Sequence, residues 1–135
     1  MQLVLDTNIV LDLLVFADPQ VQSLSEGLGA GELRWLATAE MREELARVLH
    51  YPKLAQRVAH HRGTHDAVLA DFDRHAQVVE VPPRAAVTCG DPDDQKFIDL
   101  AVAHRCTLLS KDREVLRMRK RLERLQVKAL ARFVQ

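Results

Sequence analysis

Three acidic residues follow apolar runs or open a helix at points that a parallel sheet would bring together. Asp6 comes directly after the apolar residues 3–5, and Asp112 comes shortly after the apolar residues 106–109. Asp94 stands at the start of the helix expected just before that second run. Since ligands of an open α/β sheet bind at the carboxyl ends of its strands, these acids are positioned to share one site. A carboxylate held against the protein body is costly unless it is capped, paired or bound to a metal ion.

Helical periodicity selects a fourth acid from three neighbouring glutamates. In the helix expected over residues 39–50, the apolar stripe consists of Met41, Leu45, Val48 and Leu49. At about 100° per residue, Glu44 lies at the edge of this stripe, whereas Glu43 and Glu40 point away from it. We therefore expect Glu44 to be held against the protein and the other two glutamates to be solvated.

The same geometry distinguishes the acids around residue 94. The buried face of the helix expected over residues 92–104 consists of Phe97, Ile98 and Ala101. Asp94 is in line with this face, whereas Asp93 and Asp99 project sideways. Asp94 is therefore the candidate site residue of this segment.

Purely structural roles are open to these acids as well. Asp91-Pro92 is a typical N-cap followed by a first-turn proline, and Asp94, three residues after the cap, suits the helix dipole or a capping box. Asp112 is suited to cap the helix that follows it. Asp6, at the end of an apolar strand, is less easily explained by a structural role of this kind. Together the acids favour a functional site more strongly than any one of them does alone.

Short apolar runs alternate with longer helical patterns along the chain. We expect strands at residues 3–5, 33–37, 78–81, 106–109 and 127–130. We expect helices at residues 7–16, 39–50 and 92–104, and another from the Asp18-Pro19 pair to the glycines at 27, 29 and 31. We also expect one helical segment that begins at Pro52 and a separate helix that ends near His75. A further helix is expected from Asp112 onward, and one helical turn after Leu130. A polar stretch over residues 59–65 separates the helix at Pro52 from the helix that ends near His75. This alternation predicts an α/β fold, a single doubly wound domain over residues 1–135 with a central parallel sheet flanked by helices.

Composition excludes several other classes of protein. The 135 residues are 47% apolar, enough for one sizeable core, and 19 basic residues balance 19 acidic ones. This balance argues against a disordered polyelectrolyte and against binding of nucleic acid through bulk charge. No apolar stretch is long enough to span a bilayer, the start does not resemble a signal peptide, and Cys89 and Cys106 lack metal-type spacing. We expect a reduced, cytoplasmic protein without a membrane partner.

Four blocks of residues, in this order, resemble the PIN-domain family. They are LDTNI at residues 5–9, EEL at 43–45 with VL at 48–49 and PKL at 52–54, CGDPDDQKFI at 89–98, and LSKD at 109–112. The resemblance covers nearly the whole chain, including ARF at 131–133, and is greatest to the subgroup described as toxin components of prokaryotic toxin–antitoxin systems.

The resemblance implies a ribonuclease that depends on Mg²⁺ or Mn²⁺ and hydrolyses RNA phosphodiester bonds. Its motif positions are the same acids that periodicity selects, namely Asp6, Glu44, Asp94 and Asp112. We expect Asp6 and Asp94 to bind the ion directly and the other two to act through water. Hard carboxylate oxygens suit both ions. A cognate antitoxin and a homodimer are further expectations from the resemblance.

Polar neighbours of these acids are expected to support them. Thr7 and Asn8 are placed to orient Asp6 or a water molecule, and Ser110 occupies the small polar position before the last aspartate. Residues 111–124 carry seven basic and three acidic side chains, a local excess of +4. The candidate contacts to substrate phosphates are Lys96, Lys111, Arg113 and Arg117. The alternative is that this basic segment is only a solvated surface.

Two other functions compete with the ribonuclease. A PIN-fold protein could act mainly as a partner-binding module with little catalysis. A Mg²⁺-dependent phosphatase of the haloacid-dehalogenase type also begins with a strand and an aspartate, but it needs a second acid where this chain has Asn8.

Several other polar and aromatic residues are expected to have ordinary structural roles. The histidines at 60, 61 and 65 fit a solvated polar stretch better than a metal site, and the two cysteines fit buried thiols. Trp35 is expected to pack in or beside the second strand.

Overall fold

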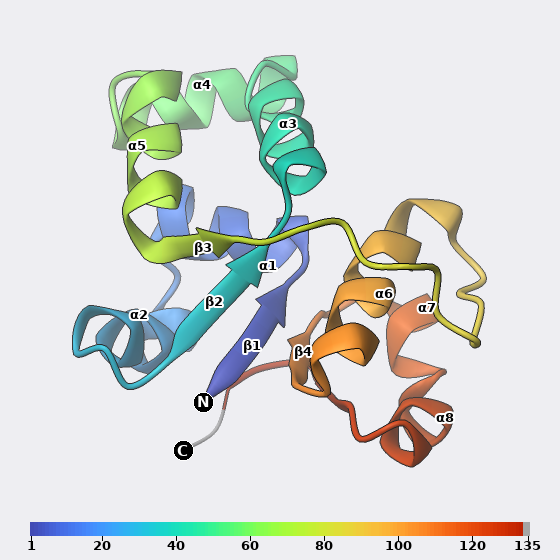
Figure 1. The fold of residues 1–135 in the computed structure, drawn as a ribbon. Helices are drawn as coiled ribbons and strands as arrows, with labels where there is room; N and C mark the ends of the chain where they lie inside the picture. The colour runs from blue at the N-terminus through green and yellow to red at the C-terminus, as the bar shows by residue number, and fades with distance from the viewer. Residues whose placement is uncertain (134–135) are drawn as a thin grey trace.

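A five-stranded parallel sheet lies at the centre of the molecule (Figure 1). The computed structural model describes residues 1–133. The strands are β1 (Gln2–Leu5), β2 (Arg34–Ala37), β3 (Ala76–Val78), β4 (Thr107–Leu109) and β5 (Lys128–Leu130), and their spatial order is β3-β2-β1-β4-β5. The chain builds one side of the sheet from β1 to β3 and then crosses to β4 beside β1. The carboxyl ends of β1 and β4 therefore form the switch point at which such sheets bind ligands.

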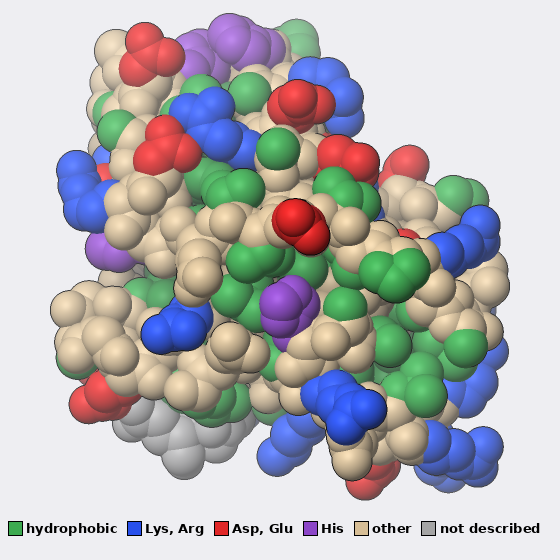
Figure 2. Space-filling view, viewed as in Figure 1, with side chains coloured by type: hydrophobic (Ala, Val, Ile, Leu, Met, Phe, Trp, Pro, Cys, Tyr) green, Lys and Arg blue, Asp and Glu red, His purple; other side chains and the backbone are tan. Residues whose placement is uncertain are grey.

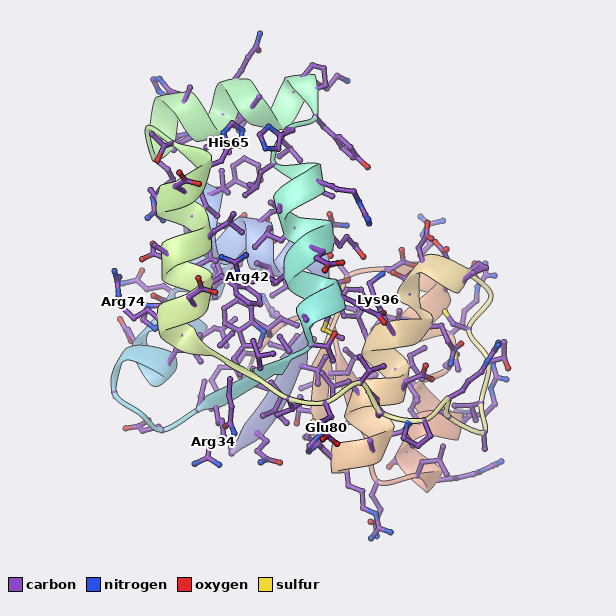
Figure 3. The ribbon with its side chains drawn as sticks, turned by 45° about the horizontal axis from the view of Figure 1, so that its top comes forward. Arg34, Arg42, His65, Arg74, Glu80 and Lys96 are labelled. Carbon is purple, nitrogen blue, oxygen red and sulfur yellow. The ribbon has the colours of Figure 1, made fainter. Side chains whose placement is uncertain are left out.

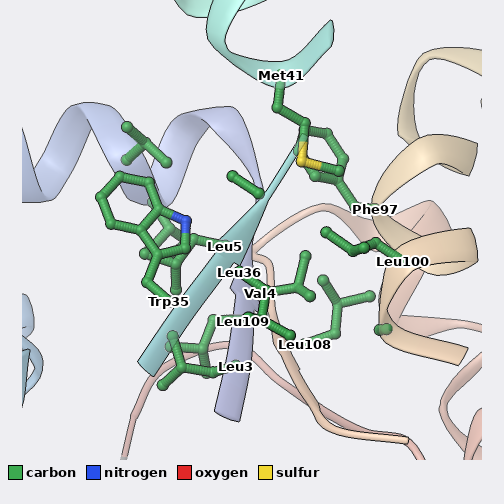
Figure 4. Packing of buried hydrophobic residues seen from close by; sticks show 14 of the residues in the cluster. Leu3, Val4, Leu5, Trp35, Leu36, Met41, Phe97, Leu100, Leu108 and Leu109 are labelled. Atoms are coloured by element: carbon green, nitrogen blue, oxygen red, sulfur yellow. The ribbon is translucent and has the colours of Figure 1, made fainter. Parts of the chain in front are cut away.

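Apolar strands and helix faces form one hydrophobic core around this sheet (Figure 4). Leu3, Val4 and Leu5 of β1 are at most 1% exposed, as expected for a central strand covered on both faces. Trp35 of β2 is buried and forms a T-shaped pair with the Phe72 ring at 5.0 Å between centroids, which confirms its packing role.

Helices cover the sheet in two groups (Figure 1). The first group contains α1 (Thr7–Leu11), η1 (Asp12–Phe16), η2 (Pro19–Val21), α2 (Gln22–Gly29), α3 (Ala39–Val48), α4 (Pro52–His61) and α5 (His65–His75). The second group, beside β4, contains η3 (Pro92–Asp94), α6 (Gln95–His104), α7 (Arg113–Leu116) and α8 (Arg119–Arg124). Among the described residues, no helix is long and apolar enough to cross a bilayer.

The α/β architecture and the parallel sheet are confirmed, but three local predictions are wrong. The third strand is β3 rather than residues 78–81, because the chain enters the sheet directly after α5. The last backbone hydrogen bond between this segment and β2 runs from the Val79 N–H to the Ala37 carbonyl. The polar stretch 59–65 does not separate the two helices over its whole length, since α4 continues to His61 and α5 begins at His65. No helical turn follows β5 among residues 131–133.

Two expected helices are also divided. The pattern over residues 7–16 is an α-helix up to Leu11 and then the π-helical segment η1. The segment from Asp112 onward consists of α7 and α8, with the buried Met118 between them. Since π-helical turns are frequent at functional sites, the position of η1 directly after the first acidic motif is notable.

Arg62 stabilises the π-helical segment from outside. Its Nη1 donates to the Leu14 carbonyl at 2.6 Å, and its Nη2 pairs with Asp71 of α5. The Arg62 side chain is only 27% exposed, so its removal leaves both partners poorly solvated.

We expect Arg62→Met to lower the free energy of unfolding by about 1–3 kcal/mol, because a partly buried carbonyl and carboxylate lose a donor. Arg74→Met is the matched control, since Arg74 also pairs with Asp71 but is 65% exposed. Urea unfolding monitored by circular dichroism measures both variants. Equal and small effects of the two substitutions would contradict the role of Arg62.

Candidate metal centre

Two of the predicted acids lie at the carboxyl ends of β1 and β4 and share one serine. Asp6 is 3% exposed, and its backbone N–H donates to the Leu109 carbonyl at 3.1 Å. The fully buried Ser110 hydroxyl donates to Asp6 Oδ2 and accepts from the Asp112 N–H at 3.1 Å. Ser110 therefore connects the two acids across the switch point, although Asp6 and Asp112 are 106 positions apart in sequence.

Asp6 has a structural duty that was not expected from the sequence. Its Oδ1 accepts from the Ile9 N–H at 2.9 Å, so it caps α1. Burial is the main cause that raises the pKa of Asp6 above its usual value, and the bonds from Ser110 and Ile9 oppose this rise. The cap fixes the orientation of the carboxylate toward the switch point.

Two other aspartates also cap helical turns. Asp112 accepts from the Glu114 N–H at 2.8 Å at the start of α7, and Asp91 accepts from the Asp93 N–H at 3.0 Å at the start of η3. The capping alternative is thus correct for both residues. It does not compete with a role in the site, because each carboxylate retains further lone pairs.

Asp94 differs from these aspartates because it makes no capping bond. Its Oδ2 is buried and has no hydrogen-bond partner within the described residues. Burial, followed by the negative charges of Asp112, Asp91 and Asp6, raises the pKa of Asp94 to about 7. The buried Oδ2 of Asp94 thus has no hydrogen-bonding task within the described residues.

The three aspartates 91, 94 and 112 form a compact acidic cluster. One carboxylate oxygen of each lies within 4.8 Å of the corresponding oxygens of the other two. Oxygen donors at this spacing, on a group that includes Asp94 with its unpartnered buried Oδ2, fit a hard divalent cation such as Mg²⁺ or Mn²⁺.

Asp91 is the member of this cluster that sequence reasoning assigned only to a cap. The Asp91-Pro92 pattern is fully explained by helix capping, so no periodic signal pointed to a second task. Its neighbourhood to Asp112 depends on the path of the loop before η3 and is visible only in three dimensions.

Glu44 reaches the site from the opposite side, on α3. As expected from periodicity, its side chain is 18% exposed while Glu43 and Glu40 are exposed. Thr7 Oγ1 donates to Glu44 Oε1 at 2.8 Å, and Lys96 Nζ of α6 forms an ion pair with Glu44 Oε2. Both oxygens of Glu44 are therefore occupied by side chains of this chain.

The remaining predicted residues surround these acids. Asn8 is exposed in the first turn of α1. Lys111 is paired with Asp12 of η1, and this hydrogen bond is the main cause that raises the Lys111 pKa. Arg113 is exposed, and Arg117 forms an exposed ion pair with Glu114 at 2.9 Å.

Lysine and arginine side chains gather over the corner that contains α7 and α8 (Figure 2). The exposed basic residues of this basic corner are Arg113, Arg117, Arg119, Lys120, Arg121 and Arg124. Since the chain enters the corner directly from Asp112, the basic surface begins beside the acidic cluster.

Other polar residues lie apart from this centre. Arg42, labelled with Lys96 in Figure 3, pairs with Asp73 and joins α3 to α5. Cys89 and Cys106 are buried free thiols, and burial raises the pKa of Cys106 to about 11. Among the described residues, the histidines take part in no group of three or more metal-type ligands.

The pKa of Asp94 makes the stability of the metal-free protein depend on pH. Between about pH 4 and pH 7 the unfolded chain ionises Asp94 while the folded chain keeps it protonated, so the unfolded state is increasingly favoured. We expect Asp94→Asn to unfold at a higher temperature than the wild type at pH 8 in EDTA, and at the same temperature at pH 4. Thermal unfolding followed by circular dichroism measures this difference. A constant difference at both pH values would contradict the perturbed pKa.

Comparisons with known proteins agree with this geometry. A family model described as PIN domain matches residues 2–114, a range that contains all the acids described above. A search of curated proteins found no match to the chain.

Proposed function

This chain belongs to the PIN-domain family, whose members are metal-dependent nucleases, and from this premise we propose that it is a ribonuclease that hydrolyses RNA phosphodiester bonds with Mg²⁺ or Mn²⁺. The observation that carries the proposal is Asp94, a partly buried carboxylate whose buried Oδ2 has no partner in the described residues and which lies beside Asp91 and Asp112. Holding these negative charges together, partly away from water, is unfavourable without a cation, and a bound divalent ion would offset both the repulsion and the lost solvation.

The acids divide the work in this proposal. Asp6 and Asp94 would hold the ion directly. Asp94 offers an oxygen without a hydrogen-bond partner in the described residues, and Asp6 accepts only from neutral donors, the Ile9 N–H and the Ser110 hydroxyl, which orient the carboxylate without neutralising its charge. A bound divalent ion lowers the pKa of water and offsets negative charge on the phosphate. Asp112 uses Oδ1 to cap α7, which leaves Oδ2 to accept a proton from the attacking water. Glu44, on α3, acts through Thr7 and Lys96, the two side chains that contact its carboxylate. Asn8 is exposed two positions after Asp6.

The basic corner supplies the attraction that an acidic centre lacks. Lys111 and Lys96 flank the acids, and Arg113 and Arg117 extend the positive charge along α7. RNA phosphates are bound in this proposal by that surface, with the scissile phosphate directed to the acids.

We expect Arg113→Gln to raise KM for RNA about threefold to tenfold with little change in kcat, since it removes a phosphate contact outside the acidic centre. The slope of log Kd against log salt should fall by about one charge contact. Lys53→Gln is a matched control, because Lys53 is also exposed but lies at the start of α4. Equal effects of both substitutions would indicate general charge attraction rather than a path along α7.

Cleavage of single-stranded RNA tests the proposed activity. Purified protein should cut RNA with Mg²⁺ or Mn²⁺, stop in EDTA, and lose activity in Asp6→Ala and Asp94→Ala. Equal cleavage by the wild type and both variants would indicate a contaminating nuclease and would contradict the proposed ribonuclease activity.

We also propose that the protein is the cytoplasmic toxin of a toxin–antitoxin pair, held by a small antitoxin and able to form a homodimer. The support is the resemblance of the motif blocks to that subgroup. Expression should arrest growth, Asp94→Asn should abolish the arrest, and co-expression of an adjacent small gene should relieve it. Growth arrest that persists in the Asp94 variant would favour the alternative of a partner-binding module with little catalysis.

A further inference from the structure

The ion pair between Glu44 and Lys96 links the two sides of the acidic centre. Lys96 lies between α3 and α6 (Figure 3), and its ammonium pairs with Glu44 Oε2 while it also donates to the Asp93 carbonyl at 2.6 Å. The carbonyl of Asp93 belongs to the turn that carries Asp94. Lys96 thus connects α3 to the backbone of the acidic turn.

Both oxygens of Glu44 are committed to this arrangement. Oε1 accepts from Thr7 Oγ1 at 2.8 Å and Oε2 pairs with Lys96, whereas Asp94 Oδ2 has no partner in the described residues. The Glu44 and Lys96 side chains are 18% and 24% exposed, so removing either one leaves a charge that water only partly solvates. The negative charge of Glu44 is therefore already balanced by a cation of this chain, the Lys96 ammonium.

Lys96 has one further donor to offer. An ammonium group carries three N–H bonds, and Glu44 and the Asp93 carbonyl account for two of them. The Phe97 ring lies 5.0 Å from Nζ, which adds a weak cation–π contact. Among the described residues Nζ has no further hydrogen bond, so one N–H remains for a phosphate oxygen of the substrate.

We propose that Glu44 is a positioning residue for Lys96 and not a ligand of the divalent ion. The ion is held by the aspartates, and the Glu44–Lys96 pair is a neutral unit that keeps the Lys96 ammonium at the edge of the acidic cluster, facing the substrate phosphate. This assignment rests on the proposed function, because it concerns the same metal centre.

A charge-balanced double variant tests this assignment directly. Glu44→Gln with Lys96→Met removes the pair without changing the net charge, so Mn²⁺ binding measured by titration calorimetry or electron paramagnetic resonance should stay within about threefold of the wild type. Lys96→Met alone removes a positive charge and leaves the Glu44 carboxylate uncompensated, so it should strengthen Mn²⁺ binding about tenfold, and the added Glu44→Gln substitution should cancel that gain. Lys96→Arg should bind as the wild type does.

The positive control is Asp94→Asn, which should weaken Mn²⁺ binding at least about tenfold. If the double variant binds Mn²⁺ as weakly as Asp94→Asn does, Glu44 is a metal ligand and the proposal is overturned. If the wild type itself binds no Mn²⁺, the metal-dependent function fails as well, so the two failures are distinguishable. Circular dichroism of each variant verifies that the fold is retained.

Discussion

Replacing Asp94 by asparagine should reduce RNA cleavage by about 1000-fold while the fold is retained, because the proposed metal ion loses a charged ligand. At about 1.4 kcal/mol for each factor of ten, this loss corresponds to about 4 kcal/mol of transition-state stabilisation. Asparagine keeps the shape of the side chain and removes its charge. In the metal-free protein the same change relieves the repulsion from Asp112, Asp91 and Asp6 that helps to raise the Asp94 pKa. The variant should therefore be inactive and more stable at neutral pH, a combination that a damaged fold cannot produce.

Asp93→Asn is the matched control for this prediction. Asp93 is the adjacent acid in the same turn, but it is exposed and lies outside the acidic cluster. Steady-state cleavage of a labelled RNA in Mn²⁺ compares the two variants with the wild type. If both asparagine variants lose activity equally, the negative charge of the turn matters rather than the Asp94 carboxylate.

The second large effect is expected at Ser110, the residue that connects Asp6 to Asp112. Ser110→Ala leaves Asp6 Oδ2 and the Asp112 N–H without a partner, and we expect activity to fall about 10-fold to 100-fold. The hydroxyl lowers the Asp6 pKa against the effect of burial, so its loss raises that pKa further. Ionisation of Asp6 then requires a higher pH, and the acidic limb of the pH–rate profile should move upward.

Thr107→Ala and Ser110→Thr are the controls for this effect. Thr107 is also buried and lies on β4, but it makes no contact with the acids in the hydrogen bonds of the described residues. Ser110→Thr keeps a hydroxyl and should restore much of the activity. An unchanged pH–rate profile in Ser110→Ala would exclude the serine from the site's chemistry.

Elements and faces were predictable from local patterns. Period-3.6 spacing correctly separated Glu44 from Glu43, since the former lies against the protein and the latter in solvent. The apolar run before Asp6 correctly indicated a central strand. The edge strand was displaced because β3 follows α5 without a loop, and a residue at a sheet edge such as Val78 carries little burial signal.

Contacts between distant segments could not be derived from such patterns. The pairing of Lys96 with Glu44, and of Lys111 with Asp12, joins residues from separate elements whose relative placement is set by the whole core. Asp91 shows a different limit, because a complete capping explanation concealed its place in the acidic cluster. The metal-binding and catalytic roles of the predicted acids stay predictions until binding and cleavage are measured.

Equal numbers of basic and acidic residues conceal an uneven distribution. The acidic cluster lies at the strand ends, and the basic corner over α7 and α8 begins beside it (Figure 2). A neutral chain can therefore combine a centre that attracts cations with a surface that attracts phosphates.

The most direct test of a metal-dependent ribonuclease is the chemical nature of the RNA ends after cleavage in Mn²⁺. Attack by water at phosphorus predicts linear monophosphate ends, cleavage that stops in EDTA, and continued cleavage when the 2′-hydroxyl at the cut position is replaced by hydrogen. All of this activity should disappear in Asp94→Asn. Cyclic 2′,3′-phosphate ends, formed equally in EDTA and by the Asp94 variant, would contradict the proposed function.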